Sequence, residues 1–388
     1  MRYSTDFSVT GLTSNLTIFD HAIKNSAGLR RRDPEESQGR HTPGAAGEPA
    51  RVRTQAGAPV ILAGDVGGTK TALALFEPGA SGLVALREAA LPSREFPTFE
   101  TTLAAFLGDG PPARLAAACF GVAGAVVDGR SAATNLPWVM DETTLSDVLA
   151  VKRVRLLNDL EATAQGVLGL PPHRLAVLQE GRARPGNFAV IAAGTGLGEA
   201  LIIRDSGRVT AVPSEGGHAD FAPSSDLEIE LLRYLKASFG PHVSWERVLS
   251  GPGLLNVYRF LRQHRGRPEP AELTARMAHE DPSAVVSQVA LAGSDPVAVE
   301  ALDLFVSLYG AEAGNLALKA LAVSGVFVAG GIAPKILSRL TAGGFVTAFR
   351  AKGRFDHLMT SIPVRVALEP RSALLGAASV AATLAGDA

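Results

Sequence analysis

The sequence predicts two α/β domains that share one cleft. Strand-length apolar runs alternate with helical patterns from residue 60 onward, which is typical of a mixed sheet flanked by helices. A Gly-rich turn between two apolar runs lies at residues 64–71, and a second turn of the same kind lies at residues 194–198. This repetition indicates two related domains, each of which contributes one turn to the same cleft.

Composition limits the possible classes of protein. The chain has 388 residues, of which 46% are hydrophobic and 19% charged, so it is long enough for two globular domains. Its 37 basic and 38 acidic residues nearly balance, which argues against nucleic-acid binding. Cys119 is the single cysteine, so no disulfide forms within the chain and we expect a reducing, cytoplasmic location. No apolar run reaches membrane-spanning length.

Residues 1–57 differ from the rest of the chain. They contain three consecutive arginines at 30–32 and a Pro/Gly/Ala-rich tract at 42–57 without clear periodicity, which predicts disorder. A transit peptide is an alternative, although Glu35 and Glu36 are unusual in one. A mis-assigned start codon is a third, and the role of this extension stays open.

The first element is a predicted hairpin formed by residues 60–64 and 72–76. Its turn carries Asp65, Thr69 and Lys70, and its backbone N–H groups can bind a phosphate. It is not a P-loop, because Thr69 stands where the second Gly belongs and a strand follows. An ordinary hairpin turn is the alternative interpretation.

The next elements complete the first domain and begin the second. Residues 83–91 are expected to form a strand, 96–107 a helix, 116–122 and 154–157 strands, and 161–168 a helix. Residues 188–193 and 199–204 then repeat the opening hairpin. The turn between them has Gly194, Gly196 and Gly198, which does not match the dinucleotide fingerprint, and a strand follows, so a Rossmann cofactor site is disfavoured.

Asn158 and Asp159 end the strand at residues 154–157 abruptly. Asn and Asp are preferred helix N-caps, which is one interpretation. The carboxyl end of such a strand is also where α/β sheets place catalytic carboxylates. Both roles are compatible, with one residue capping the helix while Asp159 faces the cleft.

A polar segment at residues 213–223 brings together Glu215, His218 and Asp220 around two glycines. One His without a second His or Cys is a weak zinc signal, and Ser214 lacks the setting of a nucleophile. These side chains suit the hydroxyls of a polyol better. Glu246 joins them in this interpretation, and the alternative for it is a surface carboxylate on a short helix.

A buried-type strand at residues 325–329 ends in Gly330 and Gly331, and Pro334 suits the first turn of a helix. Glycines allow a planar group to approach the backbone closely. We expect an adenine to lie on this surface.

In this order, the five segments resemble the hexokinase/actin-like ATP-binding superfamily. The closer similarity is to the bacterial glucokinase family, and it rests on residues 157–159, 215–223, 246–253 and 352–355. It covers the chain from about residue 58 to the C-terminus. The related repressor, open reading frame and kinase (ROK) family has a similar opening motif, but its kinases have a Cys-rich zinc site that a chain with one cysteine cannot supply.

The resemblance implies a two-domain actin-like (ribonuclease H-like) ATPase fold. Residues 58–169 and 369–388 would form a small α/β domain that includes the last helix at about 372–384, and residues 170–368 a large one. The implied activity is that of a cytoplasmic transferase, a glucokinase that makes glucose 6-phosphate from glucose and ATP in the first step of glycolysis. The implied cofactors are ATP and Mg²⁺, and a homodimer is implied, with neither a nucleic acid nor a membrane as partner.

The resemblance also implies a role for each motif residue. Asp159 would be the general base, and the sugar would be bound by Asn158, Asp159, Glu215, His218 and Glu246. Asp65 would orient Mg²⁺ through water. The nucleotide would be bound by Gly64, Asp65, Val66, Gly67, Gly68, Thr69, Gly194, Thr195, Gly196, Gly330 and Gly331.

Lys70 departs from the family pattern, in which close relatives often carry Asn. Its amine either adds a cationic contact to the phosphates or is a solvated group that points away, and we favour the second.

Two other functions remain as alternatives to a glucokinase. A sugar-responsive regulator would need a DNA-binding element, and residues 1–57 lack a convincing helix-turn-helix pattern. An actin-like structural ATPase would not need the segment at 213–223.

Overall fold

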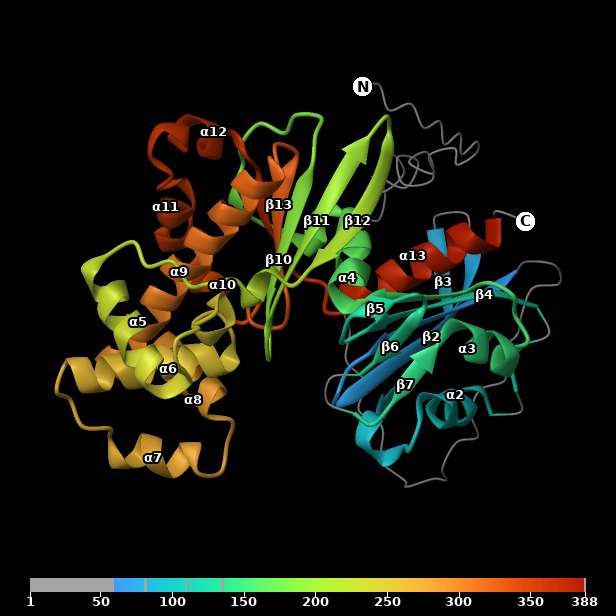
Figure 1. Cartoon of the computed structure of the whole chain (residues 1–388), viewed down its shortest axis with the longest axis horizontal. Coiled ribbons are helices and arrows are strands. Elements are labelled where there is room, and N and C mark those ends of the chain that lie inside the picture. Colours follow the sequence, from blue (N-terminus) through green and yellow to red (C-terminus); the bar gives the residue numbers. More distant parts are fainter. Residues whose placement is uncertain (1–58, 80–81, 109, 113, 134–135, 387–388) are drawn as a thin grey trace, which may run out of the picture.

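The computed structural model describes residues 59–79, 82–108, 110–112, 114–133 and 136–386. The predicted disorder of residues 1–57 lies outside these residues. Two mixed sheets form the framework, with two helices between them and further helices on their outer faces (Figure 1). The α/β class predicted from the alternating pattern is therefore confirmed.

The first sheet has five strands in the order β3-β2-β1-β4-β8. β2 is antiparallel to β1 and to β3, whereas β4 and β8 are parallel to β1 and β4 respectively. The strands are β1 (Val60–Val66), β2 (Lys70–Gly79), β3 (Gly82–Pro92), β4 (Leu115–Val122) and β8 (Val154–Asn158). They extend beyond the predicted strands because the turns between β1, β2 and β3 are tight.

Both faces of the first sheet are covered. On one face Phe99, Leu103 and Phe106 of α2 (Phe99–Leu107) pack with Leu145 of α3 (Glu142–Leu149) on the sheet. α2 begins three residues later than predicted, because the side chain of Thr98 accepts a hydrogen bond from Thr101 N and caps it. The other face packs against α4 (Asp159–Leu168) and α13 (Ser372–Gly386).

A small sheet and a short helix were not foreseen from the sequence. The sheet has the order β5-β6-β7, and its strands are β5 (Val126–Val127), β6 (Arg130–Ala132) and β7 (Val139–Asp141). The 3₁₀ helix η1 (Ser93–Glu95) follows β3 directly. These strands have two or three residues, too few to give a recognisable alternation of polar and apolar side chains.

The second sheet repeats the plan of the first. Its order is β12-β11-β10-β13-β14-β9, with β11 antiparallel to β10 and β12, and β13 and β14 parallel to β10 and β13 respectively. β9 is antiparallel to β14 and has no counterpart in the first sheet. The strands are β9 (Leu175–Gln179), β10 (Phe188–Ala193), β11 (Leu197–Asp205), β12 (Arg208–Ser214), β13 (Gly325–Ala329) and β14 (Val364–Ala367).

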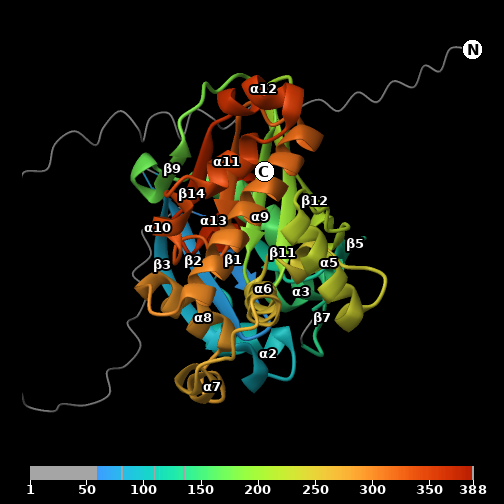
Figure 2. The same ribbon diagram turned by 90° about the vertical axis from the view of Figure 1, so that its left-hand side faces the viewer.

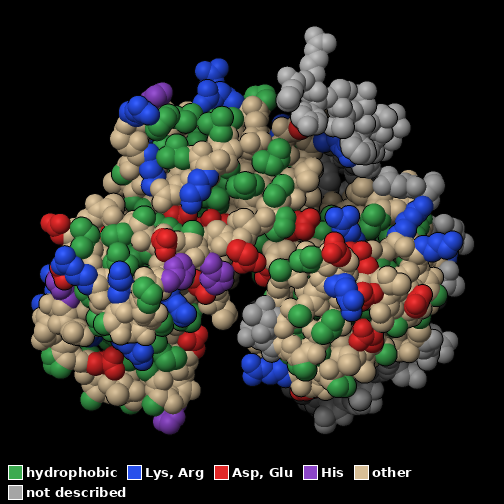
Figure 3. Space-filling view, in the orientation of Figure 1, with side chains coloured by type: hydrophobic (Ala, Val, Ile, Leu, Met, Phe, Trp, Pro, Cys, Tyr) green, Lys and Arg blue, Asp and Glu red, His purple; other side chains and the backbone are tan. Residues whose placement is uncertain are grey.

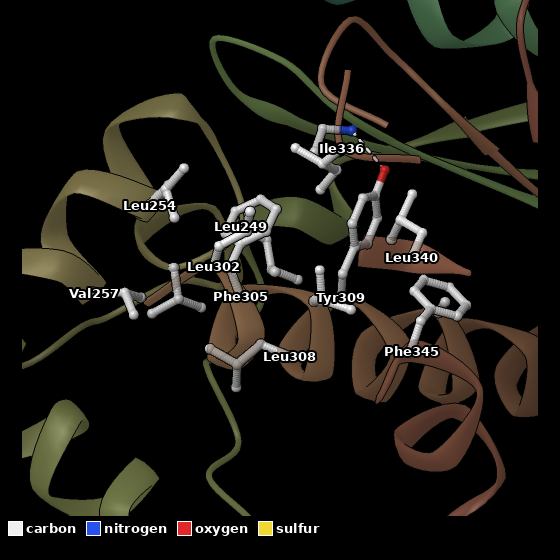
Figure 4. Packing of buried hydrophobic residues seen from close by; sticks show 14 of the residues in the cluster. Leu249, Leu254, Val257, Leu302, Phe305, Leu308, Tyr309, Ile336, Leu340 and Phe345 are labelled. Atoms are coloured by element: carbon white, nitrogen blue, oxygen red, sulfur yellow. Dashed lines mark hydrogen bonds between the residues drawn. The ribbon is translucent and has the colours of Figure 1, made fainter. Parts of the chain in front are cut away.

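The outer face of the second sheet carries most of the remaining helices (Figures 1 and 2). α9 (Pro296–Ala320) runs through the largest core, in which Leu302, Phe305 and Tyr309 are fully buried (Figure 4). Around it lie α5 (Asp226–Phe239), α6 (Gly251–His264), α7 (Ala271–Met277), α8 (Pro282–Ala292), α10 (Leu337–Leu340), α11 (Gly344–Arg350) and α12 (Asp356–Ser361). Four 3₁₀ turns complete this half: η2 (Pro172–Arg174), η3 (Gly216–His218), η4 (Trp245–Arg247) and η5 (Gly353–Phe355).

α4 and α13 cross between the two sheets (Figure 1). The two helices can approach closely because Gly166 and Gly376 have no side chain. A methyl group on Gly166 would overlap with Ser372 O, and one on Gly376 with Ala162 O. α4 also packs Ala164 and Val167 against strands of the second sheet. The helix that begins at Asp159 is thus in contact with both halves of the molecule.

The predicted domain boundaries fall at the end of α4 and between β14 and α13. In the described part of the chain, no helix is both long and apolar enough to cross a membrane.

Candidate active site

The first Gly-rich turn is held in one conformation by its own backbone and by Ser93. Gly67 N donates to Lys70 O at 3.1 Å, which closes the turn between β1 and β2. Ser93 Oγ donates to Gly67 O at 2.7 Å, and Ser93 N donates to Thr69 O at 3.0 Å. Thr69 is exposed at the tip. Backbone N–H groups fixed in this way can bind an anion without further ordering.

Two of the predicted nucleotide-binding residues lie beneath this turn. Gly64 is buried, and a methyl group on it would come within 2.7 Å of Phe120 Cδ1 and 2.8 Å of Leu73 Cδ2. Val66 is also buried, with its side chain in the core of the first sheet. Their side-chain positions therefore serve packing, and only their backbone groups are available to a ligand.

Asp65 and Asp159 lie near each other at the carboxyl ends of parallel strands. Asp65 pairs with Gly121 of β4, which in turn pairs with Leu157 of β8. A methyl group on Gly121 would lie 2.8 Å from Ala162 Cβ, so the glycine lets α4 approach the sheet. This edge of the sheet is where α/β folds bind ligands.

Both carboxyl groups have raised pKa values. Burial raises the pKa of Asp65 from 3.8 to about 6, against the opposing effect of the Lys70 charge. The pKa of Asp159 is likewise raised to about 6. Burial is the main cause, the charges of Asp65 and Glu215 act in the same direction, and the Leu160 N–H acts against them. A carboxylate with a pKa near 6 is largely ionised at neutral pH and is a stronger base than an exposed Asp.

Asn158 is a helix cap, as the sequence indicates. Its Oδ1 accepts from Leu160 N at 2.9 Å, and its Nδ2 donates to Gly124 O at 3.0 Å. Asp159 Oδ1 also accepts from Leu160 N, at 2.8 Å. These bonds fix both side chains at the start of α4.

The second Gly-rich turn joins β10 to β11. Gly194 N donates to Gly196 O at 2.8 Å, and Gly251 N at the start of α6 donates to Gly194 O at 2.8 Å. Thr195 is exposed between the two glycines. A methyl group on Gly198 would overlap with the side chain of Leu160, so the second turn lies directly against the start of α4. The start of α4 therefore lies against the second predicted phosphate turn, while the charge of Asp65, next to the first turn, acts on Asp159.

Glu246 lies against this second turn. Its Oε2 accepts a hydrogen bond from Leu197 N at 3.0 Å and would lie 2.5 Å from a methyl group on Gly196. The sequence placed Glu246 with the sugar residues, and the structure adds this bond to the turn that carries Thr195.

The polar segment around η3 faces Asp159. Glu215 is close enough for its charge to raise the pKa of Asp159. His218 Nε2 lies 4.0 Å from Glu215 Oε2, and both side chains are more than half exposed. Asp220 binds His242 Nδ1 at 2.9 Å. Glu215 of this segment is therefore within electrostatic reach of the Asp159 carboxylate.

The strand predicted for the adenosine lies beside the second turn. β13 is parallel to β10, and Gly330 has φ +82° and approaches Ala193 O so closely that a methyl group there would overlap with it. Gly331 is exposed, with open space where a side chain would be. The hydroxyl of Tyr309 accepts from Ala193 N at 3.0 Å, the bond drawn dashed in Figure 4, and lies 3.3 Å from Ala329 O.

Ser93 and Tyr309 were not found by the sequence reasoning. Each braces a predicted nucleotide segment from behind through hydrogen bonds to backbone atoms. They come from parts of the chain distant from the motifs they support, so no local pattern marks them.

Lys70 lies on the same face of the first sheet as Asp65. Asp65 pairs with Ala72 of β2, and Lys70 is two residues from Ala72, so the alternation along the strand directs both side chains to one side. Its charge lowers the pKa of Asp65. Lys70 is exposed, so the preferred expectation of a solvated amine that points away from the phosphates stays a prediction.

Two hollows border these elements. One of about 220 Å³ touches the second turn and is lined by Thr195, Phe239, Glu246, Arg247, Ser250, Pro252 and Asn256. A shallower one of about 520 Å³ follows η1 and contains no predicted site residue. In the space-filling view a broader hollow separates the two lobes, with acidic and histidine side chains gathered beside its upper end (Figure 3).

The two mixed sheets share a five-stranded plan, and each carries a Gly-rich turn on the side of Asp159. Together with the comparisons, this arrangement defines a two-domain sugar kinase with the actin-like ATPase fold. The family model described as Glucokinase matches residues 62–384. The chain belongs to the glucokinase family.

Individual relatives agree with this membership. A glucokinase from Synechocystis sp. is 43% identical over 83% of this chain and 98% of its own length, and one from Nostoc sp. is 41% identical over 84% and 99%. A crystal structure of a glucokinase from an Antarctic psychrotroph has 31% identity and a TM-score of 0.72, and the match covers 83% of this chain and 98% of that one.

Proposed function

We infer that the protein is an ATP-dependent glucokinase, which forms glucose 6-phosphate and ADP. Family membership supports the activity. The observation that carries the mechanism is the half-buried carboxylate of Asp159, which lies within reach of the Asp65 and Glu215 charges and has a pKa of about 6.

In the proposed reaction, Asp159 is the general base. It accepts the proton of the sugar's primary hydroxyl as that oxygen bonds to the γ-phosphorus, while the bond from phosphorus to the ADP oxygen breaks. General-base catalysis of this kind contributes roughly 10²–10⁴ in rate. The bonds at Leu160 N hold the carboxylate at a fixed position at the end of β8, which is what a positioned base requires.

The sugar would lie between Asp159 and the η3 segment. We propose that Asn158, Glu215, His218 and Glu246 bind its hydroxyls. The second amide hydrogen of Asn158 and the second carboxylate oxygen of Glu246 support this, because the bonds described above do not use them. Glu215 and His218 support it because both side chains are more than half exposed and their mutual contact is long, at 4.0 Å. A site built on such bonds rejects a sugar that lacks a hydroxyl by up to roughly 10⁴–10⁵.

ATP would lie across the cleft. Gly67, Gly68 and Thr69 would bind phosphate on one side, Thr195 and Gly196 on the other, and the base would lie over Gly330 and Gly331 beside the hollow at Thr195. Lys70, whose charge acts on Asp65, would add a positive charge near the transferred phosphoryl group. Positioning and charge neutralisation account for most of the catalysis in such reactions.

Magnesium fits this site through one carboxylate and the substrate. Among the described residues no cluster of three His, Cys, Asp or Glu side chains forms a metal cage. Mg²⁺ usually binds nucleotide phosphates, water and one or two carboxylates, and Asp65 supplies the carboxylate. When bound, the ion would neutralise charge that develops on the phosphates.

A panel of sugars and donors tests this function. The purified protein with Mg²⁺ and ATP is assayed for ADP release with glucose, mannose, galactose and 2-deoxyglucose, and glucose is then tested with polyphosphate as donor. Release that depends on glucose supports the proposal. Equal release without sugar would instead identify an ATPase, and sugar binding without release in any combination would favour a regulator.

Four predictions go beyond family membership. They are the division into residues 58–169 with 369–388 and residues 170–368, the homodimer, the requirement for Mg²⁺ and the cytoplasmic location. The buried thiol of Cys119 is compatible with the last of these.

A further inference from the structure

Two carboxyl groups are buried together beneath the η3 segment, outside the motifs described above. Glu199 in β11 is 1% exposed, and Glu312 in α9 is fully buried. Buried carboxyl groups are rare unless they are paired. Their place in the fold therefore requires a physical explanation.

Glu199 supports the turn at residues 214–218 through its backbone and its side chain. Ser214, its partner across the strands, donates from Oγ to Glu199 O at 3.1 Å and accepts from Gly216 N at 3.2 Å. A methyl group on Gly216 would overlap with Glu199 Oε2, so the carboxyl group packs directly against the backbone between Glu215 and His218.

The polar and positively charged partners of the pair gather around Glu312 rather than Glu199. Asn315 Nδ2 donates to Glu312 Oε2 at 2.8 Å, and Lys319 Nζ lies 3.4 Å from Glu312 Oε1. Lys352 Nζ donates to Asn315 Oδ1 at 2.7 Å and lies in the fields of Glu312 and Glu228. Glu199 Oε1, in contrast, has no hydrogen-bond partner among the described residues.

Glu199 therefore keeps its proton. Burial and then the Glu312 charge raise the pKa of Glu199 to about 8, against the opposing effect of Lys319, and Glu312 shares a hydrogen bond with it. Tyr309 is the other titratable group that faces Glu199, and burial keeps the pKa of its hydroxyl far above neutrality.

We propose that Glu199 is a positioning residue for sugar binding: as a neutral acid bonded to Glu312 it holds the Glu215–His218 turn in place, and its ionisation displaces that turn. Two negative charges side by side in a buried site repel strongly, and Glu199 Oε2 packs directly against the backbone at Gly216. This inference rests on the proposed role of Glu215 and His218 in binding the sugar.

Glu199→Gln and Glu199→Ala test the proposal in the full-length enzyme. In the wild type, KM for glucose should rise as the pH passes about 8, while kcat and KM for ATP change little. Glu199→Gln keeps the size of the side chain and a hydrogen-bond donor but cannot ionise, so the KM of this variant for glucose should not show the rise. Glu199→Ala should raise KM for glucose about tenfold at every pH, equivalent to about 1.4 kcal/mol. Glu180→Gln, at an exposed position, should follow the wild type.

A measurement without sugar separates this inference from the proposed function. Trp245 is buried, and its backbone N–H donates to Ala219 O at the end of η3, so this tryptophan is next to the turn and its fluorescence can report on it. In a Trp138→Phe background, the unliganded protein should show a fluorescence titration near pH 8 that Glu199→Gln abolishes. A titration unchanged by Glu199→Gln, or a KM profile for Glu199→Gln equal to that of the wild type, would overturn the inference. Loss of glucose binding in every form with this titration intact would count against the proposed function alone.

Discussion

The charge of Asp65 raises the pKa of Asp159, although the two residues lie almost one hundred positions apart in the chain. They come together because β1 and β8 flank β4 in parallel, with Gly121 between them. The protonation of Asp159 therefore depends on the charge of Asp65, whose own pKa is lowered by the positive charge of Lys70. Several predictions depend on this pair.

The acid side of the pH profile should report these carboxylates. Because Asp159 must be ionised to accept a proton and its pKa is about 6, kcat/KM for glucose should fall as the pH drops below about 6. This fall in kcat/KM, the acid limb of the pH profile, reports the pair of carboxylates rather than one residue. Initial rates between pH 4.5 and 8, with the enzyme's stability checked at each pH, measure it. A flat profile down to pH 5 would contradict the assignment.

The same shifts predict how stability changes with pH. The folded protein holds protons on Asp65 and Asp159 at pH values where the unfolded chain has lost them, since both pKa values rise from 3.8 to about 6. Their contribution to the free energy of unfolding is therefore present at low pH and lost as the pH rises through about 6. Denaturant unfolding of the wild type and of Asp65→Asn/Asp159→Asn should differ in this range, and identical pH dependence would disprove the shifts.

Lys70→Gln should weaken ATP binding modestly. The side chain is exposed, so its removal should raise KM for ATP about two- to fivefold. It should also move the acid limb to higher pH, because Lys70 lowers the pKa of Asp65. Lys152→Gln is the control, since Lys152 precedes β8 at the end opposite Asp159. An acid limb that stays in place would show that the Lys70 charge does not reach Asp65.

Glu246 should affect both substrates, and two substitutions separate its roles. Glu246→Ala removes the bond to Leu197 N and should raise KM for ATP and for glucose about tenfold or more. Glu246→Gln keeps an acceptor for Leu197 N, so KM for ATP should stay near that of the wild type while KM for glucose rises. Glu272→Ala on α7 is the exposed control. Equal effects of Gln and Ala on KM for ATP would show that this bond does not hold the turn.

Gly376→Ala should destabilise the protein by opening the crossing of α4 and α13. Its new methyl group would overlap with Ala162 O, and overpacking of this kind costs roughly 1–3 kcal/mol. Gly386→Ala in the same helix meets nothing within 4 Å and should be neutral or slightly stabilising. Thermal or denaturant unfolding compares the two, and equal midpoints would contradict the packing.

The motifs and the repeated hairpin were predictable because they are local. Asp65, Asp159 and the two Gly-rich turns each follow an apolar run that identifies a strand end, and parallel strands bring such ends to one edge. The cap formed by Asn158 was equally local.

The supports of the site were not predictable, because they depend on contacts between distant segments. Ser93 and Tyr309 reach the turns from η1 and α9, and nothing in their neighbours indicates this. Glu199 follows the second turn in the sequence, but its partner Glu312 lies more than one hundred residues later. The sheet face on which Lys70 lies follows from the pairing of β1 with β2, which no local pattern indicates.

Asp159→Asn tests the central claim most directly. The substitution keeps the size of the side chain and the Asn158 cap, so the protein should fold and bind glucose with an affinity near that of the wild type, as calorimetry would show. Its kcat, from ADP and glucose 6-phosphate measured together, should fall by roughly 10²–10⁴. Asp147→Asn, at an exposed position on α3, should leave kcat unchanged. Glucose 6-phosphate formed by Asp159→Asn at the rate of the wild type would contradict the account.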